Sequence, residues 1–331
     1  MRPEPQAQRP SAAQRPLVLP PPALPHHVDQ DRRLGIECDY EARIFGQGSN
    51  FFHIENWYSI HGLMRGALRL LGMHERGQRN ARAIQVRHND IPLPGLPAAF
   101  EGFRILHISD LHLDMAEDMP HALSTAVRGV DYDICVLTGD FRGKTFGAYD
   151  AALEGMRQVR LQLNGEVYGV LGNHDTIRML PGLEDMDIRM LMNESLTLAR
   201  GDAVVHLAGI DDPHYYRADN LEKASSEIPA DAVSILLAHS PEIYHHAAYA
   251  DFDLLLCGHT HGGQICLPGG IPLMCNANTP RALCRGPWRF RQLQGYTSLG
   301  SGACMVDVRL NCPPEITVHR LAGPIVQPPM V

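Results

Sequence analysis

The sequence predicts an α/β fold in which two packed sheets carry helices on their outer faces. Short runs rich in Val, Ile and Leu alternate with helical patterns from about residue 83 to residue 323. Several of these runs end in Gly or in polar residues, as the buried strands of parallel sheets do. The number of strands fits two packed sheets with helices outside, which is one of the few stable layer arrangements.

The strands and helices can be placed from the same patterns. The runs expected as strands before the C-terminal part are residues 103–108, 132–137, 166–171, 233–238 and 252–257. The stretches expected as helices are residues 120–128, 148–163, 183–193, 218–227 and 241–248. Further strands are expected near the C-terminus at residues 296–300, 303–309 and 315–321.

The chain has 331 residues, which allows one large domain with an extension. Residues 1–33 are dense in Pro and charge and lack an apolar pattern, so we expect a disordered tail there. Residues 34–82 form an N-terminal extension and residues 83–323 form the main domain. Residues 324–331 are expected to form a short tail.

The extension contains one amphipathic segment, Asn56–Met73. Its apolar residues fall on one helical stripe, and Arg65 and Arg69 lie on the other side. Two interpretations remain open for this segment. The helix packs on the main domain, or it lies in the plane of a membrane surface, because basic residues flank a wide apolar face. The second interpretation predicts a peripheral membrane contact.

Charge and composition narrow the possible partners and locations. The formal net charge is -8 with the 18 histidines counted as neutral, so we expect no DNA partner. No stretch approaches the roughly 20 apolar residues of a membrane span. The eight cysteines contain no C-x-x-C pair, and thiols in core strands favour a reducing compartment. We therefore expect a cytoplasmic protein, at the inner face of the membrane if the amphipathic helix binds there.

Four short motifs and one lone histidine follow the predicted strands. They are Asp110-x-His112, Gly139-Asp140, Gly172-Asn173-His174-Asp175, His239 and Gly258-His259-Thr260-His261. In open α/β sheets the ligand site lies beyond the carboxyl ends of the strands. Oxygen and imidazole ligands placed there can converge on two divalent metal ions. Such a pair of ions is suited to the attack on phosphate esters.

The residue types suggest how two ions are held. Asp140 is the expected bridge, because a shared carboxylate keeps two ions about 3.5–4 Å apart. Asp110 and His112 alternate along one extended segment, so their side chains point to the same side. His259 and His261 repeat that arrangement. Asn173 adds an amide oxygen and His239 an imidazole, and this mixed set fits Mn, Fe, Zn or Co and disfavours Ca.

Taken together, the motifs resemble those of the calcineurin-like metallophosphoesterases. The family pattern is D-x-H, G-D, G-N-H-[DE], H and G-H-x-H, and all five blocks occur in order across residues 105–264. The resemblance implies the metallophosphatase fold, a four-layer α/β/β/α sandwich. It also implies a binuclear metal-dependent phosphoesterase that cleaves a phosphodiester or pyrophosphate bond through attack by metal-bound hydroxide.

The resemblance also assigns roles to individual residues. Metal one would be held by Asp110, His112, Asp140 and His261, and metal two by Asp140, Asn173, His239 and His259. His174 would contact the scissile phosphate and protonate the leaving oxygen, with Asp175 orienting its ring. The Gly258–Gln264 segment is similar to a GHTHGGQ signature of a bacterial branch. Some members of that branch are similar to UDP-2,3-diacylglucosamine pyrophosphatases, which suggests a nucleotide-linked lipid precursor as substrate.

Other functions remain open from the sequence. A protein of the same fold can be a non-catalytic scaffold for a protein partner, although an intact His174 argues against this. A cyclic-nucleotide or nucleic-acid phosphodiesterase is a further alternative. Arg142 and Lys144 either neutralise a phosphate or belong to a solvated loop. The same two interpretations apply to the basic and aromatic stretch 281–291, which would grip a diphosphate or a base.

Overall fold

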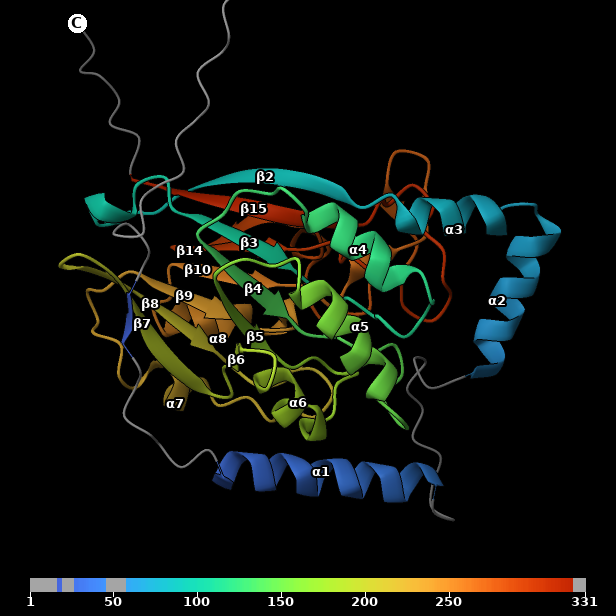
Figure 1. The fold of residues 1–331 in the computed structure, drawn as a ribbon, viewed down its shortest axis with the longest axis horizontal. Coiled ribbons are helices and arrows are strands. Elements are labelled where there is room, and N and C mark those ends of the chain that lie inside the picture. The colour runs from blue at the N-terminus through green and yellow to red at the C-terminus, as the bar shows by residue number, and fades with distance from the viewer. Residues whose placement is uncertain (1–16, 20–26, 46–57, 324–331) are drawn as a thin grey trace, which may run out of the picture.

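A computed structural model describes residues 17–19, 27–45 and 58–323 of the chain. Two sheets pack face to face in it, and helices cover their outer sides (Figure 1). The order of the six-stranded sheet is β2 (Gln85–Pro92), β15 (Glu315–Ala322), β3 (Arg104–Ile108), β4 (Ile134–Thr138), β5 (Glu166–Val170) and β6 (Ile188–Met190). The order of the seven-stranded sheet is β1 (Leu17–Leu19), β7 (Glu194–Arg200), β8 (Ala203–Gly209), β9 (Ser234–Leu237), β10 (Leu254–Cys257), β14 (Leu293–Thr297) and β13 (Gly286–Phe290).

The helices divide between the two outer faces. Helices α4 (Met119–Val127), α5 (Asp150–Arg160) and α6 (Leu180–Glu184) share one hydrophobic cluster with the six-stranded sheet. Helices α7 (Leu221–Ser225) and α8 (Tyr244–Tyr249) share another with the seven-stranded sheet. A third cluster lies between the sheets and draws on both. The predicted four-layer α/β/β/α sandwich is therefore confirmed, with an N-terminal helical extension.

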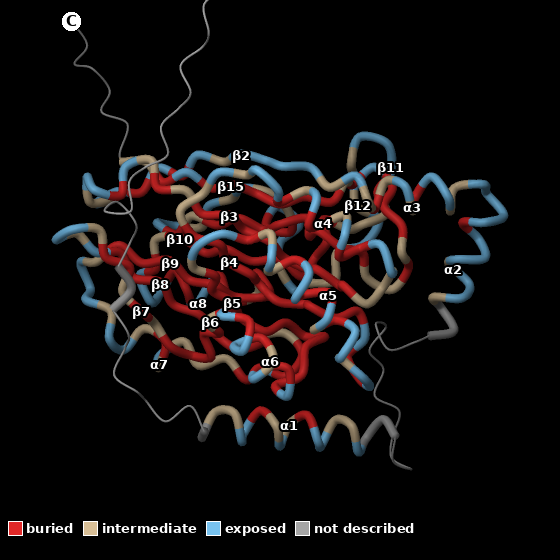
Figure 2. The backbone as a smooth tube through the Cα atoms, viewed as in Figure 1, coloured by how far each residue is buried: buried red, intermediate tan, exposed pale blue. Residues whose placement is uncertain are grey.

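The central strands are buried on both faces, which explains why their sequences are almost continuously apolar. In β3 and β4, Leu106 and Cys135 point toward α4 and α5, whereas Ile105 and Ile134 point into the layer between the sheets. Strands β3, β4 and β5 are parallel, with Ile105 beside Ile134 and Cys135 beside Val167. Their carboxyl ends therefore meet at one edge of the sheet (Figure 2).

Two predicted elements were wrong. The helix expected over residues 183–193 ends at Glu184, because Asp187 adopts a left-handed backbone with φ 58° and the chain then enters β6. Residues 303–309, which were expected to form a strand, have no regular secondary structure. The next residue, Leu310, forms an isolated β-bridge with Ile265. The valines of residues 303–309 face a helix of the extension instead of a sheet.

The extension contains three helices, α1 (His27–Phe45), α2 (Tyr58–Leu70) and α3 (His74–Arg82). Helix α1 begins at His27, so the tail predicted for residues 1–33 overlaps its first turns. The high Pro content that suggested disorder ends at residue 25. Strand β1 also falls within that predicted tail and pairs with β7. No helix among the described residues is long and apolar enough to cross a bilayer.

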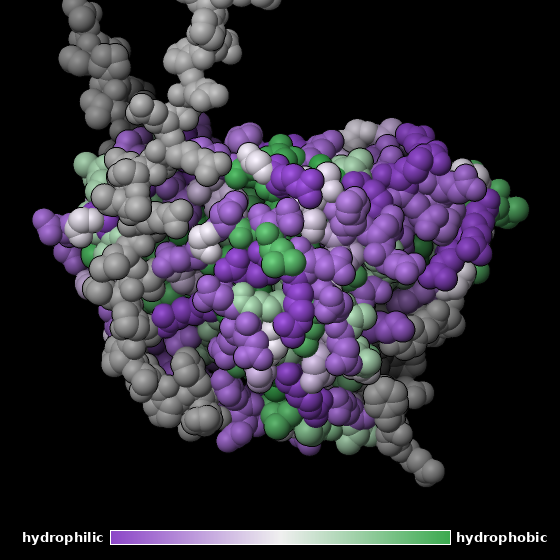
Figure 3. Space-filling view, in the orientation of Figure 1, coloured by the Kyte–Doolittle hydropathy of each residue, from purple (hydrophilic) through white to green (hydrophobic). Residues whose placement is uncertain are grey.

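Helix α2 lies inside the predicted segment Asn56–Met73. Its Met64 and Leu68 pack against Val306 and Val308, as the packing interpretation requires. Other leucines of this segment are exposed, namely Leu63 at 74 %, Leu70 at 89 % and, directly after the helix, Leu71 at 68 %. A small group of hydrophobic residues is visible at the outer tip of the edge that α2 occupies, next to hydrophilic residues (Figure 3).

Candidate metal centre

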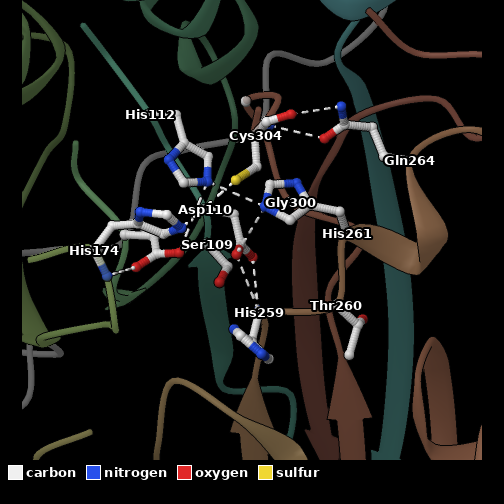
Figure 4. A network of polar contacts seen from close by, with 12 residues as sticks. Ser109, Asp110, His112, His174, His259, Thr260, His261, Gln264, Gly300 and Cys304 are labelled. Carbon is white, nitrogen blue, oxygen red and sulfur yellow. Dashed lines mark hydrogen bonds and ion pairs between the residues drawn. The ribbon is translucent and has the colours of Figure 1, made fainter. Parts of the chain in front are cut away.

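Every predicted metal ligand lies just beyond the carboxyl end of a central strand, and together they form one buried cluster (Figure 4). Each of these ligand residues is at most 6 % exposed. The strands that carry them are β3, β4, β5, β9 and β10. The site spans both sheets, because β9 and β10 belong to the seven-stranded sheet.

The first group of donor atoms comprises Asp110, His112, Asp140 and His261. One ligand atom from each lies within 4.8 Å of the others. Nε2 of His112 is 3.1 Å from Nε2 of His261, which is in turn 3.3 Å from Oδ1 of Asp110. These four residues are the set that the sequence assigns to metal one.

The second group comprises Asp140, His239 and His259, again within 4.8 Å of one another. Nε2 of His239 lies 3.2 Å from Oδ2 of Asp140. The amide oxygen of Asn173 is 2.8 Å from both His239 Nε2 and His259 Nδ1, so it joins this group. These residues are the set assigned to metal two.

Asp140 is the residue that the two groups share. Its Oδ2 lies between Nε2 of His239 at 3.2 Å and Nε2 of His112 at 3.8 Å. Its Oδ1 accepts a hydrogen bond of 2.9 Å from the backbone N–H of His174. The carboxylate is thus held at the boundary between the groups, where a bridging ligand must lie.

The backbone at the site is strained. Asp110, His112, Asp140, His259 and His261 all have positive φ, between 43° and 71°. Such conformations are costly for residues other than Gly and concentrate at functional sites.

Glycines of the motifs permit the tight packing around these ligands. A Cβ atom on Gly172 would lie 2.3 Å from Oδ1 of Asp140, and one on Gly258 would lie 2.3 Å from Oδ2 of Asp110. Only a residue without a side chain fits at either position. The Gly before Asn173 and the Gly before His259 therefore each have a steric reason.

Burial and neighbouring charges set the protonation of the ligands. Burial raises the pKa of Asp110 to about 6. Burial also acts to raise the pKa of Asp140, but His239, His174 and His112 hold it well below its usual range. Against the effect of its own burial, Asp140 raises the pKa of His239 to about 10. Because a metal ion needs the neutral imidazole of His239 as its ligand, metal binding at this group would compete with protons.

His174 lies beside the first group without belonging to it. Its ring centroid is 5.4 Å from that of His112, and its Nδ1 is 3.1 Å from the hydroxyl of Thr145. The prediction that Asp175 orients this ring was wrong. The motif supplies an acidic residue next to His174, but the ring turns away from it toward a loop that follows β4.

The carboxylate of Asp175 instead ties two loops together. It accepts hydrogen bonds from the backbone N–H groups of Asp140, Phe141 and Gly172 at 2.7–2.8 Å. Burial raises the pKa of Asp175 to about 6. The hydrogen bonds of Asp175 fix the backbone of the two loops that carry Asp140 and Asn173.

The position of Arg142 agrees with neither interpretation of the sequence, a phosphate contact or a solvated loop. It is only 2 % exposed, and its guanidinium donates to the carbonyls of His174, Thr145 and Gly147. Arg142 therefore fixes the backbone of His174 and also that of Thr145, whose hydroxyl bonds the His174 ring. Lys144 is exposed.

The basic and aromatic stretch 281–291 engages other parts of the fold. Arg285 donates to the carbonyl of Gly270, and the Trp288 indole donates to Thr297 Oγ1 at 2.9 Å. Arg291 lies over the ring of Tyr249. The backbone of the stretch also contacts the ligand loop, because the hydroxyl of Thr260, between His259 and His261, donates a 2.6 Å hydrogen bond to the carbonyl of Cys284.

Three residues near the ligands carried no clear signal in the sequence. Nε2 of His174 is 3.5 Å from Sγ of Cys304, and the guanidinium of Arg309 is 3.1 Å from Nδ1 of His261. The ring of His214 lies 4.1 Å from that of His259, and its Nδ1 is 3.0 Å from Glu242. Only His214, at the end of a strand run, was open to prediction from its position.

A cavity of about 230 Å³ opens directly beside the metal ligands. Asp140, His174, His259 and His261 form its polar floor. The remaining wall is mainly apolar, and we call this part of the cavity the vestibule; its apolar residues are Met64, Ile265, Leu273, Met274 and Met305. Met64 comes from α2, so the extension contributes to the wall.

The fold and the site together define a class, the metal-dependent hydrolases of phosphate esters. The family model described as calcineurin-like phosphoesterase matches residues 103–263, which contain every predicted ligand. In these residues the chain is similar to the calcineurin-like metallophosphoesterases, and the family match and the relatives support a hydrolase that acts on phosphoester bonds.

Curated relatives extend over most of the domain. The chain is 29 % identical over 257 residues to the uncharacterized metallophosphoesterase YkoQ of Bacillus subtilis, covering 74 % of this chain and 93 % of that one. It is 26 % identical to the phosphodiesterase YaeI of Escherichia coli, with 66 % and 82 % covered. It is 28 % identical to a transmembrane protein with metallophosphoesterase domain from Bos taurus, covering 69 % of this chain but only 55 % of that protein.

Proposed function

We propose that the two groups of ligands each bind a divalent metal ion and that the protein hydrolyses a phosphodiester or pyrophosphate bond. The observation that carries this proposal is the position of Asp140, whose carboxylate belongs to both groups. The donor set fits the ions, because buried carboxylate, amide and imidazole atoms face one another at 2.8–3.3 Å. Such a set suits Mn, Fe, Zn or Co.

The ions, when bound, supply a nucleophile at neutral pH and offset charge on the phosphate oxygens. The protein's own contribution centres on His174, which faces the cavity next to the ligands. Thr145 fixes its Nδ1, so its Nε2 is presented to the substrate, where it protonates the leaving oxygen. Asp175 and Arg142 keep the loops that carry these groups in place.

The vestibule supports a substrate with an apolar group close to the scissile phosphate. Its methionines and Leu273 form an apolar surface against which an acyl chain or another apolar group can pack. We therefore favour an ester of an apolar alcohol or a nucleotide-linked lipid precursor over a small polar monoester. The name of the relative YaeI, a phosphodiesterase, supports a diester.

Hydrolysis of bis(p-nitrophenyl) phosphate tests the proposal. The purified protein is stripped with a chelator and assayed with and without added Mn²⁺. We expect turnover that depends on the metal and exceeds that of p-nitrophenyl phosphate, the matched monoester. Full metal loading without hydrolysis of any diester or pyrophosphate, including lipid-linked ones, would instead favour a non-catalytic scaffold that binds a protein partner.

We further propose that α2 contacts a membrane surface. Leu63, Leu70 and Leu71 are exposed, and Arg65 and Arg69 lie beside them, exposed as well. Apolar side chains of the β11–β12 hairpin (Cys266–Leu267 and Ile271–Pro272) are also exposed near the vestibule, among them Leu267 and Ile271. Leucine side chains enter the lipid and arginines attract anionic headgroups. The vestibule would then open close to the bilayer.

Replacing the three exposed leucines of α2 with Gln is expected to weaken binding to anionic liposomes by at least about 100-fold, because burying each side chain is worth about 1.5–3 kcal/mol. Sedimentation with vesicles of phosphatidylglycerol and phosphatidylcholine measures this. Leu161→Gln is the matched control, since Leu161 is 82 % exposed directly after α5 and is not among the residues that line the cavity. Equal sedimentation of all variants would leave α2 as a packing element only.

A further inference from the structure

Helix α1 lies outside the part of the chain that the family model matches, yet its inner face reaches two loops of the active site. Buried and exposed segments alternate along it (Figure 2). Between Asp29 and Ala42, where burial is described, its buried residues are Arg33 and Glu37, one helical turn apart. A buried charged pair on an exposed helix is unusual, and such residues are buried only when they are paired.

Arg33 holds one loop to another. Its Nη2 donates a 3.0 Å hydrogen bond to the carbonyl of Asp175, and its Nη1 bonds to the carboxylate of Asp211. The guanidinium also lies 3.6 Å from the centre of the Tyr216 ring. Asp175 is in the loop after β5, and Asp211 is in the loop after β8.

Glu37 extends the same contact along the chain. Its carboxylate accepts a 2.7 Å hydrogen bond from the backbone N–H of Ile177 and another from the hydroxyl of Thr176. It also accepts from Nε of Arg33 at 3.0 Å. The pair therefore engages three consecutive residues, from Asp175 to Ile177.

These three residues directly follow Asn173 and His174. Arg142 holds the carbonyl of His174, and Arg33 holds the carbonyl of the next residue. Because peptide units are planar, a shift of the backbone at Asp175 is passed to His174. A misplacement of about 1 Å at a reacting group costs on the order of 100-fold in rate.

We infer that α1 is part of the active site and that Arg33 and Glu37 are positioning residues for His174. The inference rests on the proposed function, in which His174 is the general acid. It assigns a role in the reaction to a helix that no part of the phosphoesterase sequence pattern includes.

The variant Arg33→Met tests this inference in the full-length protein loaded with Mn²⁺. We expect kcat to fall about 10- to 100-fold, as for loss of other residues that orient metal ligands. The fall should be larger for diphenyl phosphate than for bis(p-nitrophenyl) phosphate, because p-nitrophenolate needs little protonation to leave. Asp29→Asn is the matched control, since Asp29 bonds Lys223 of α7 at 2.7 Å and touches neither loop of the site.

Coupling to His174 separates positioning from general stabilisation. In a His174→Ala background, Arg33→Met should cost little further activity, because the group that it positions is already gone. Additive losses that are equal for both substrates would overturn the inference. Should Arg33→Met not fold, Glu37→Gln provides the same comparison, since the amide keeps one acceptor for the Ile177 N–H.

A readout without turnover separates this inference from the proposed function. Amide hydrogen exchange of residues 172–177 should be faster in Arg33→Met and Glu37→Gln than in the wild type and in Asp29→Asn. Unchanged exchange in both variants would overturn the inference even if the enzyme is active. Faster exchange in a protein that cleaves neither a diester nor a pyrophosphate would support the contact and reject the proposed function.

Discussion

Replacing His174 with Ala is expected to lower turnover by about 10²- to 10⁴-fold while the protein keeps its metal ions. This corresponds to about 3–5 kcal/mol of transition-state stabilisation. His174 lies in the cavity wall, but it is absent from both groups of converging ligand atoms. Its loss therefore removes the proton donor and leaves the donor set intact. Metal analysis and initial rates on the same sample measure both quantities.

The choice of leaving group sharpens this experiment. Diphenyl phosphate should show the full loss, and bis(p-nitrophenyl) phosphate a smaller one, because only the poorer leaving group needs an acid. His121→Ala is the control, since His121 is exposed on α4. If the His174→Ala protein loses metal along with activity, the residue is a ligand and not an acid.

Replacing Asp140 with Asn is expected to remove both ions together and to abolish detectable turnover. One carboxylate serves both groups, so its charge stabilises both cations. An amide offers one neutral oxygen and cannot bridge two cations with the same strength. The metal content should fall from about two ions per chain to about zero, because each site depends on the shared ligand.

A single-group ligand provides the contrast. Asn173→Ala removes an oxygen that lies 2.8 Å from His239 and from His259 in the second group, so we expect it to weaken one ion more than the other. Titration of the stripped proteins with Mn²⁺ distinguishes the two patterns. Full retention of both ions by Asp140→Asn would remove that residue from the bridge.

The fold and the ligands were predictable because short sequence patterns determine the strands and the turns that follow them. Buried parallel strands require continuous apolar runs, and the turns after them require Gly wherever a Cβ atom would collide with a ligand. At Gly172 and Gly258 that collision distance is 2.3 Å, so the motif is fixed by sterics as well as by chemistry. The chain order of the motifs then places them at one edge of the sheets.

What the sequence did not predict depends on contacts between distant residues. Thr145 bonds the His174 ring across a loop of irregular structure, and no pattern marks a threonine for that role. Arg33 is 142 residues from Asp175 and lies in a segment whose composition suggested disorder. The helix expected over residues 183–193 failed for a local reason, because its apolar spacing suits α6 and β6 equally well.

The vestibule has a consequence for the range of substrates that the enzyme accepts. Met64, Met274 and Met305 supply much of its apolar wall. Methionine side chains are unbranched and polarisable, so they repack around apolar groups of different shape at little cost. Selectivity is therefore expected to reside in the phosphate and its two ester linkages, while chain length and branching of the apolar group are tolerated broadly.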